Sequence, residues 1–268
     1  MIPKKIHYCW FGRGEKPKLA QKCIASWKKY CPDYEIIEWN EDNFDINSNT
    51  YVRQAYENRK FAFVTDYVRL YALYNYGGIY MDTDVEVLKP LDRFLEHKAF
   101  SSFESNKLIP TGIMAAEKGN QWIKDLLDEY DNLKFVKDDG SFDLKPNTNR
   151  ITELSLEKYG LKLNNEYQDL KDGTVTIYPY EYFCPKSVET YQINLTDNSY
   201  TIHHFSGSWL PEIEKKRIEL LNSCITKNIK KYGIEKGTKK GKLEYRLKFY
   251  LTHPIYLIKK ISKGKENK

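Results

Sequence analysis

Two aspartates separated by one residue, Asp82 and Asp84, are the first chemical feature of this 268-residue chain. Residues 79–81 have the pattern of a short buried strand, and residues 85–88 return to an extended, apolar pattern. Ligands of open α/β sheets bind beyond the carboxyl ends of strands. Two carboxylates at such an end give Mg²⁺ or Mn²⁺ hard oxygen ligands and leave coordination positions for a phosphate. An isolated Asp-x-Asp is more often a solvated turn, but the flanking apolar strands favour a site here.

Asp66 and Arg69 are a second pair of residues that could bind a ligand. Apolar residues recur at helical spacing over residues 63–74, and Gly77-Gly78 ends the pattern. Residues three apart share one face of a helix. One interpretation is a surface ion pair, which would stabilise the fold little. The apolar neighbours favour the other interpretation, in which the carboxylate and the guanidinium hold hydroxyl groups of a ligand.

His203 and His204 are adjacent in a third stretch, residues 200–210, which has an extended pattern. Side chains alternate across a strand, so only one of the two histidines can face the site. Imidazole suits Mn²⁺ better than Mg²⁺. A histidine at a strand end is more often an ordinary hydrogen-bonding group, and this interpretation stays open.

The elements that must position these residues alternate along the chain. This order predicts an α/β fold with a mixed, mainly parallel sheet between helices. Strands are predicted over residues 4–11, 34–39, 99–104, 108–116 and 174–179, and helices over residues 17–31, 51–58, 122–130 and 211–232.

Composition supports one domain with an appendage. The chain is 41% hydrophobic, with 22 tyrosines and 12 phenylalanines to build a core. No apolar run approaches the ~20 residues that span a bilayer, and no secretory leader is expected, so we expect a cytoplasmic protein. The five cysteines lack C-x-x-C spacing, which argues against a zinc site or a disulfide framework.

The positive charge is concentrated at the end of the chain. Residues 225–268 contain thirteen lysines and one arginine against three glutamates, a net charge of +11, so the rest of the chain carries −5 of the total of +6. The basic tail therefore does not indicate a nucleic-acid partner for the main domain. Its lysines surround an aromatic, leucine-rich pattern, which predicts either a segment on an anionic membrane surface or a helix packed on the main domain.

The segment 61–90 resembles the DXD core of the family-32 glycosyltransferases, which are capsular-polysaccharide and mannosyltransferase-like sugar transferases. It is similar, more distantly, to the glucosylating domains of large clostridial toxins. The resemblance also includes the I-H-x-x-W-F-G run of the first strand and the Gly207-Ser208-Trp209 ending, and so covers roughly residues 2–211. Within the segment it is carried by Ala62, Asp66, Arg69, Leu73, Gly77, Gly78, Tyr80, Asp82 and Asp84.

The resemblance implies a GT-A-type fold, which we expect over residues 1–232. The charge and apolar pattern of residues 233–268 predict a basic amphipathic helical tail after it. It implies retaining transfer of a sugar from a UDP- or GDP-sugar to a polysaccharide or a lipid-linked oligosaccharide. An enzyme on lipid-linked acceptors would work at the inner membrane face, so the tail predicts peripheral attachment there. The implied cofactor is Mn²⁺ or Mg²⁺, which would neutralise the leaving diphosphate.

The resemblance also implies the role of each site residue. The implied catalytic residues are Asp66, Arg69, Asp82 and Asp84. The H-x-x-G run from His204 to Gly207 makes His204 the third metal ligand beside Asp82 and Asp84, with His203 as the alternative. The implied donor-binding residues are Trp10, which would stack on the base, together with Asp66, Arg69, Tyr80, Asp82, Gly207, Ser208 and Trp209.

Two other classes of protein remain open. A metal-dependent nucleotidyltransferase could use the same aspartates, but it would attack phosphorus and release pyrophosphate instead of a nucleoside diphosphate. A non-catalytic protein that binds carbohydrate or membrane is the third class, and hydrolysis of a nucleotide-sugar donor would exclude it. Relatives often carry Gly-Pro ahead of the next helix, whereas the segment here is Pro146-Asn147-Thr148-Asn149. This difference leaves the acceptor contacts open.

Overall fold

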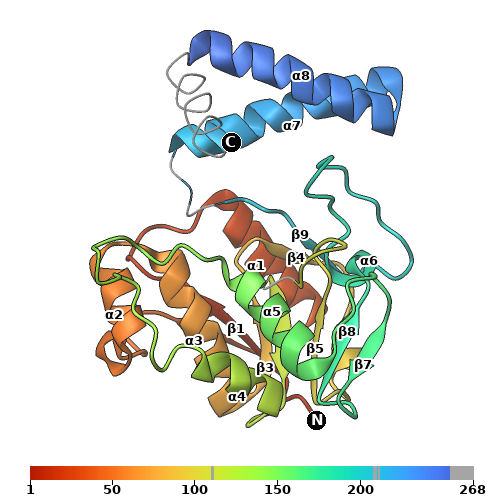
Figure 1. Cartoon of the computed structure of the whole chain (residues 1–268). Helices are drawn as coiled ribbons and strands as arrows, with labels where there is room; N and C mark the ends of the chain where they lie inside the picture. The colour runs from red at the N-terminus through yellow and green to blue at the C-terminus, as the bar shows by residue number, and fades with distance from the viewer. Residues whose placement is uncertain (110–111, 208–209, 211, 254–268) are drawn as a thin grey trace. The chain divides into compact units, whose positions relative to one another are not determined.

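The computed structural model describes residues 1–109, 112–207, 210 and 212–253, and its contacts divide the chain into two units (Figure 1). The first unit comprises residues 1–186 and 194–206, and the second comprises residues 187–193 and the chain from residue 207 onward. The sequence analysis placed the boundary after residue 232. The division lies at residues 206–207 instead, because helix α7 (Glu212–Tyr232) packs along helix α8 (Ile234–Thr252) and belongs to the same unit.

A sheet forms the centre of the first unit, with the strand order β2-β1-β3-β6-β5-β8-β7 in the described part of the chain. β1, β2, β3, β5 and β8 run in one direction, and β6 and β7 run in the other. The expected mixed, mainly parallel sheet is therefore confirmed. The strands are β1 (Lys5–Cys9), β2 (Glu35–Trp39), β3 (Gly78–Met81), β5 (Ala99–Ser102), β6 (Ile113–Ala116), β7 (Gln168–Leu170) and β8 (Val175–Tyr178).

Helices cover both faces of this sheet (Figure 1). Alternation along β3 sends Tyr80 into one apolar core and its neighbours Ile79 and Met81 into the other. The Tyr80 side includes residues of α2, α3, α4 and α5, and the opposite side includes Cys23 and Trp27 of α1. The helices of the first unit are α1 (Lys18–Tyr30), α2 (Thr50–Glu57), α3 (Phe61–Tyr76), α4 (Gln121–Asp128), α5 (Asn147–Tyr159) and α6 (Tyr180–Phe183), with short 3₁₀ turns at Ile46–Ser48 and Asp92–Phe94.

The turn from α3 into β3 fixes the strand that carries the aspartates. Gly78 has φ +120°, and a Cβ atom there would lie 2.8 Å from the carbonyl oxygen of Lys5 on β1, so glycine is required for this close approach. His7 Nε2 lies 2.8 Å from the carbonyl oxygen of Gly77, and Trp39 donates to His7 Nδ1 at 3.1 Å. His7 is therefore a structural histidine whose Nε2 carries the proton.

A second pairing brings the histidines to the aspartates. β4 (Val85–Val87) pairs antiparallel with β9 (Thr201–His203), and Val85 lies opposite His203. Among the described residues of the extended stretch predicted over 200–210, the strand covers Thr201–His203. The chain leaves the strand after His203, and the backbone N–H of His204 donates to the carbonyl oxygen of Asp84 at 2.9 Å.

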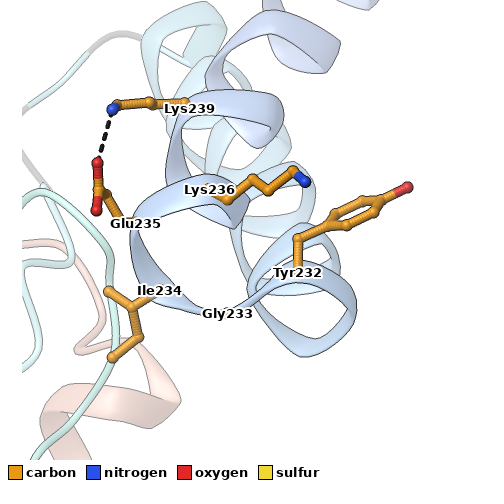
Figure 2. A pocket seen from close by; sticks show the side chains of 6 residues that line it. All are labelled: Tyr232, Gly233, Ile234, Glu235, Lys236 and Lys239. Carbon is orange, nitrogen blue, oxygen red and sulfur yellow. Dashed lines mark hydrogen bonds and ion pairs between the residues drawn. The ribbon is translucent and has the colours of Figure 1, made fainter.

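The second unit is a hairpin of two helices, α7 and α8, joined at Gly233. Cβ atoms at Gly237 and Gly241 would lie 2.5 Å from backbone atoms of Ile229 and Ile225, so these glycines let the helices pack closely. Figure 2 shows the hollow at the turn, where Glu235 and Lys239 form an ion pair of 2.7 Å and the other lining residues are Tyr232, Gly233, Ile234 and Lys236. None of the described helices combines the length and the apolar character needed to cross a bilayer.

Candidate active site

Asp82, Asp84 and His203 bring three potential metal-ligand atoms together at the carboxyl end of β3. One ligand atom of each residue lies within 4.8 Å of the others. His203 Nε2 is 3.3 Å from Asp84 Oδ1, and both side chains are mostly buried, with 14% and 13% of their surface exposed. The other Asp84 oxygen, Oδ2, accepts the backbone N–H of Ser206 at 2.7 Å. The β4–β9 pairing therefore positions an imidazole directly beside the two carboxylates.

His204, the histidine that the sequence analysis preferred as third ligand, lies elsewhere. Its Nε2 is 2.8 Å from Glu86 Oε2, which also pairs with Lys22 at 2.8 Å. The reason is the alternation of side chains along the chain: once His203 faces Asp84, His204 points away. The structure therefore favours the alternative histidine, His203, as the partner of the two aspartates.

Asp66 and Arg69 share one face of α3, as their spacing predicts. Arg69 lies 3.2 Å from the Asp66 carboxylate and 3.3 Å from Asp82 Oδ1, and its own side chain is 5% exposed. Tyr80 donates its hydroxyl to Asp82 Oδ1 at 2.9 Å, and the Arg69 guanidinium lies 4.6 Å from the centre of the Tyr80 ring. The ion pair of Asp66 and Arg69 is thus buried, and Arg69 also contacts Asp82, the first aspartate of the DXD motif.

Burial and charge act in opposite directions on the acids of the site. Burial would raise the pKa of Asp84, but the charge and hydrogen bond of His203 and the Ser206 N–H outweigh it and hold this pKa well below its usual range. Burial would lower the pKa of His203, but Asp84 raises it well above its ordinary value. Burial raises the pKa of Asp66 to about 6, with Arg69 offsetting part of the effect.

Trp10 lies just beyond the carboxyl end of β1 and is partly exposed. Its indole N–H donates to the carbonyl oxygen of Gly14 at 2.6 Å, and the Lys16 ammonium lies 5.7 Å from the ring centre. One edge of the ring is therefore fixed by the following loop. Its contact with a nucleotide base stays a prediction.

The other predicted donor contacts have mixed positions. Tyr80 is buried and reaches the site through Asp82. Gly207, with φ +57°, is described as part of the second unit. Ser208 and Trp209 lie outside the described residues. Donor binding by these four residues therefore stays a prediction.

Three further residues lie beside the cluster. Lys186 is partly buried and donates from Nζ to the carbonyl oxygen of His204 at 2.5 Å, and burial lowers its pKa. Gly112 accepts the backbone N–H of Asp82 at 2.8 Å, and a Cβ atom there would lie 2.7 Å from His203 Nδ1. Glu104 is partly buried near Asp82 and His203. Only the glycine carries a local signal, since it precedes a buried strand.

Comparisons with known proteins agree with the DXD motif. Residues 17–101 match the model of the glycosyltransferase sugar-binding region containing a DXD motif. Inositol phosphoceramide mannosyltransferase 3 of Schizosaccharomyces pombe is 29% identical over 130 residues, which are 46% of this chain and 35% of that protein. Subversion of eukaryotic traffic protein A of Legionella pneumophila is 27% identical over 173 residues, which are 53% of this chain and 27% of that protein.

The matched regions thus span about a third of the length of these relatives. Among solved structures, the PaToxG glycosyltransferase is 19% identical, with a TM-score of 0.43 over 59% of this chain and 70% of that chain. The family match over residues 17–101 includes both aspartates of the motif, so this part of the chain is similar to the sugar-binding region of DXD-containing glycosyltransferases.

Proposed function

We propose that the protein is a retaining, metal-dependent enzyme that moves a sugar from a UDP- or GDP-sugar to a saccharide or a lipid-linked oligosaccharide. The observation that carries the proposal is the cluster of Asp82, Asp84 and His203. Beside it lies the buried pair of Asp66 and Arg69. A cation site for a diphosphate therefore adjoins a charged pair suited to sugar hydroxyls.

The donor set of this cluster fits a divalent cation. Two carboxylates and one imidazole are a combination that Mn²⁺ accepts, with Mg²⁺ as the oxygen-preferring alternative. The Nε2 atom of His203 faces Asp84, so this nitrogen is the one that could bind the metal. When bound, the metal would supply positive charge to the leaving diphosphate.

Residues of the chain itself would bind the sugar and the base of the donor. Asp66 and Arg69 would hold the hydroxyl groups of the transferred sugar, while Arg69 also keeps Asp82 in place through its 3.3 Å contact. Trp10 would stack on the base, because this partly exposed indole lies just beyond the carboxyl end of β1. In this front-face proposal, the leaving phosphate oxygen accepts the proton of the attacking acceptor hydroxyl.

Two observations support a lipid-linked acceptor at a membrane surface. A relative that matches 46% of this chain is named for transfer to inositol phosphoceramide, a lipid. Helix α8 also exposes a stripe of Leu243, Leu247 and Leu251, which are 58%, 60% and 80% exposed. Lys242 and Arg246 are exposed beside this stripe, and an apolar stripe with basic flanks is typical of helices that lie on anionic lipid.

The test is product release from nucleotide sugars by the purified protein with Mn²⁺. We expect a free nucleoside diphosphate, and we expect Asp84→Asn to reduce its release by roughly 100-fold or more, because a neutral amide is a poor ligand for a hard cation. Asp169→Asn, on β7 of the same sheet, is the control and should retain activity. Release of pyrophosphate would indicate a nucleotidyltransferase, and full activity of a folded Asp84→Asn variant would contradict the metal site.

A further inference from the structure

Glu104 lies at the same edge of the sheet as the metal-ligand cluster. β3 and β5 run in the same direction, because each pairs antiparallel with β6 between them. Asp82 follows β3 directly, and Glu104 follows β5 by two residues. The residue before β6, Gly112, contacts both Asp82 and His203 at this edge, as described above. Sheet topology therefore places the Glu104 carboxylate across β6 from Asp82.

The Glu104 side chain differs from the other acids of the site in its partners. Its backbone N–H donates to Leu108 at 2.9 Å, which closes the turn between β5 and β6. Its carboxylate has neither a hydrogen bond nor an ion pair with any residue that the structure describes. By contrast, Asp66 and Asp84 each have a cationic partner. Glu104 is partly buried, and its oxygens are not among the fully buried side-chain atoms that lack a partner, so the carboxylate is open to a ligand or to water.

The surroundings restrict what this carboxylate can bind. Burial raises the pKa of Glu104. The nearby charge of His203 lowers this pKa, and the charge of Asp82 raises it. A carboxylate repels the diphosphate of a donor, so its ligand is a neutral hydrogen-bond donor. Glu104 is also not one of the residues whose ligand atoms form the metal cluster. Hydroxyl groups are the neutral donors that a sugar substrate brings to such a site.

We propose that Glu104 positions the acceptor by accepting a hydrogen bond from a hydroxyl group next to the attacking one, whose own proton goes to the leaving phosphate. This inference rests on the proposed function, because it assigns the acceptor side of the same site. Asp66 and Arg69 lie on α3, which packs on β1 and β3, whereas Glu104 follows β5 on the other side of β6. The donor sugar and the acceptor thus approach the cluster from different strands. When no saccharide acceptor is present, Glu104 accepts a hydrogen bond from the water molecule that attacks the donor, and the other proton of this water goes to the leaving phosphate.

The experiment measures donor hydrolysis, which requires no knowledge of the natural acceptor. Wild type, Glu104→Gln and Glu117→Gln are incubated with Mn²⁺ and UDP-glucose, UDP-galactose or GDP-mannose, and release of nucleoside diphosphate is followed. Glu117 follows β6 at the opposite edge of the sheet, where it pairs with the N-terminal ammonium. It is therefore a matched control that removes one carboxylate at the other end of the neighbouring strand.

We expect Glu104→Gln to lower kcat by about tenfold or more while the KM for the nucleotide sugar and the affinity for Mn²⁺ stay unchanged. Its melting temperature should be equal to or above that of wild type, because a partly buried charge is removed. Glu104→Asp, which keeps the charge, should give an intermediate kcat. Glu117→Gln should hydrolyse the donor like wild type.

An unchanged kcat in a folded Glu104→Gln variant would overturn the inference. A raised KM would also overturn it, because it would place Glu104 in contact with the donor, and weaker Mn²⁺ binding would place it at the metal. A loss of kcat accompanied by a lower melting temperature would indicate that Glu104 has a structural role instead. If wild type releases no nucleoside diphosphate from any of the three donors, the proposed function falls and this inference falls with it. If wild type is active, the kcat of the Glu104→Gln variant tests the role of Glu104 separately from the proposed function.

Discussion

At the scale of single residues, the acids of the candidate site are stabilised by built-in cations. Arg69 lies within 3.3 Å of the carboxylates of both Asp66 and Asp82, and His203 lies 3.3 Å from that of Asp84. The negative charge of these three acids is therefore partly balanced within the chain itself. A metal ion that binds His203 must first replace the proton that Asp84 holds there, so metal binding and proton release are coupled.

The two adjacent histidines give the sharpest test of the metal site. We expect His203→Ala to weaken Mn²⁺ binding by roughly 10-fold to 100-fold, and His204→Ala to change it much less. The variants are matched controls for each other, because the two side chains are 14% and 17% exposed and each contacts a carboxylate. Calorimetric titration with Mn²⁺ alone measures both. The opposite ranking would return the assignment to His204, as the H-x-x-G pattern implied.

Asp66 predicts an unusual pH dependence of stability. Its folded pKa of about 6 lies above the ordinary value of 3.8, because burial disfavours the charged form. Between these two pH values the folded state therefore binds more protons than the unfolded state. The stabilising contribution of Asp66 to the free energy of unfolding is present below pH 3.8 and is lost as pH rises through 6.

The measurement is the free energy of unfolding of wild type and Asp66→Asn in metal-free buffer. Relative to the variant, wild type should lose roughly 3 kcal/mol between pH 3.8 and 6, which is about 1.4 kcal/mol for each unit of pKa difference. Because both proteins share all other titrating groups, the difference isolates Asp66. A constant difference across this range would show that Arg69 fully compensates burial.

At the scale of elements, local sequence patterns were enough to predict α3 and β3, but they could not predict which histidine lies beside Asp84. Apolar spacing and the two glycines are properties of one short segment, and the helix and strand form where they predict. The choice between His203 and His204 depends on the register of β4 with β9, which joins residues far apart in the sequence. The unit boundary likewise depends on glycine packing within the α7–α8 hairpin.

The turn between α3 and β3 should be intolerant of a side chain. Gly78→Ala places a Cβ atom 2.8 Å from the Lys5 carbonyl oxygen at φ +120°, so we expect a loss of roughly 2 kcal/mol or more in the free energy of unfolding. Gly119→Ala is the control, because Gly119 also has positive φ, +76°, but an added Cβ meets nothing within 4 Å. Urea unfolding measures both. Equal losses would mean that backbone strain, and not crowding against β1, sets the cost.

At the scale of the whole molecule, charge and apolar surface are unevenly shared between the two units. Tyr245 and Phe249 of α8 pack against Cys224 of α7, so one side of α8 is used within the hairpin. The stripe of Leu243, Leu247 and Leu251 lies on a different side of the helix and is exposed. Glu244, the acid nearest the stripe, is already paired with Lys227 and Lys248. The remaining basic residues therefore give this side a positive character suited to anionic lipid.

Vesicle binding tests this role of α8 without removing any part of the chain. We expect the full-length protein to bind vesicles of phosphatidylglycerol at low salt and to bind phosphatidylcholine much less, since screening and loss of surface charge both weaken the attraction. Replacing Leu243, Leu247 and Leu251 by serine should weaken binding to the anionic vesicles by about tenfold or more, yet leave donor hydrolysis in solution unchanged. The control replaces Leu144, Leu156 and Leu163, which are exposed in the first unit, and should bind like wild type. If the wild-type protein ignores anionic vesicles at low salt, the stripe does not bind membrane, and packing on another protein surface becomes the better explanation.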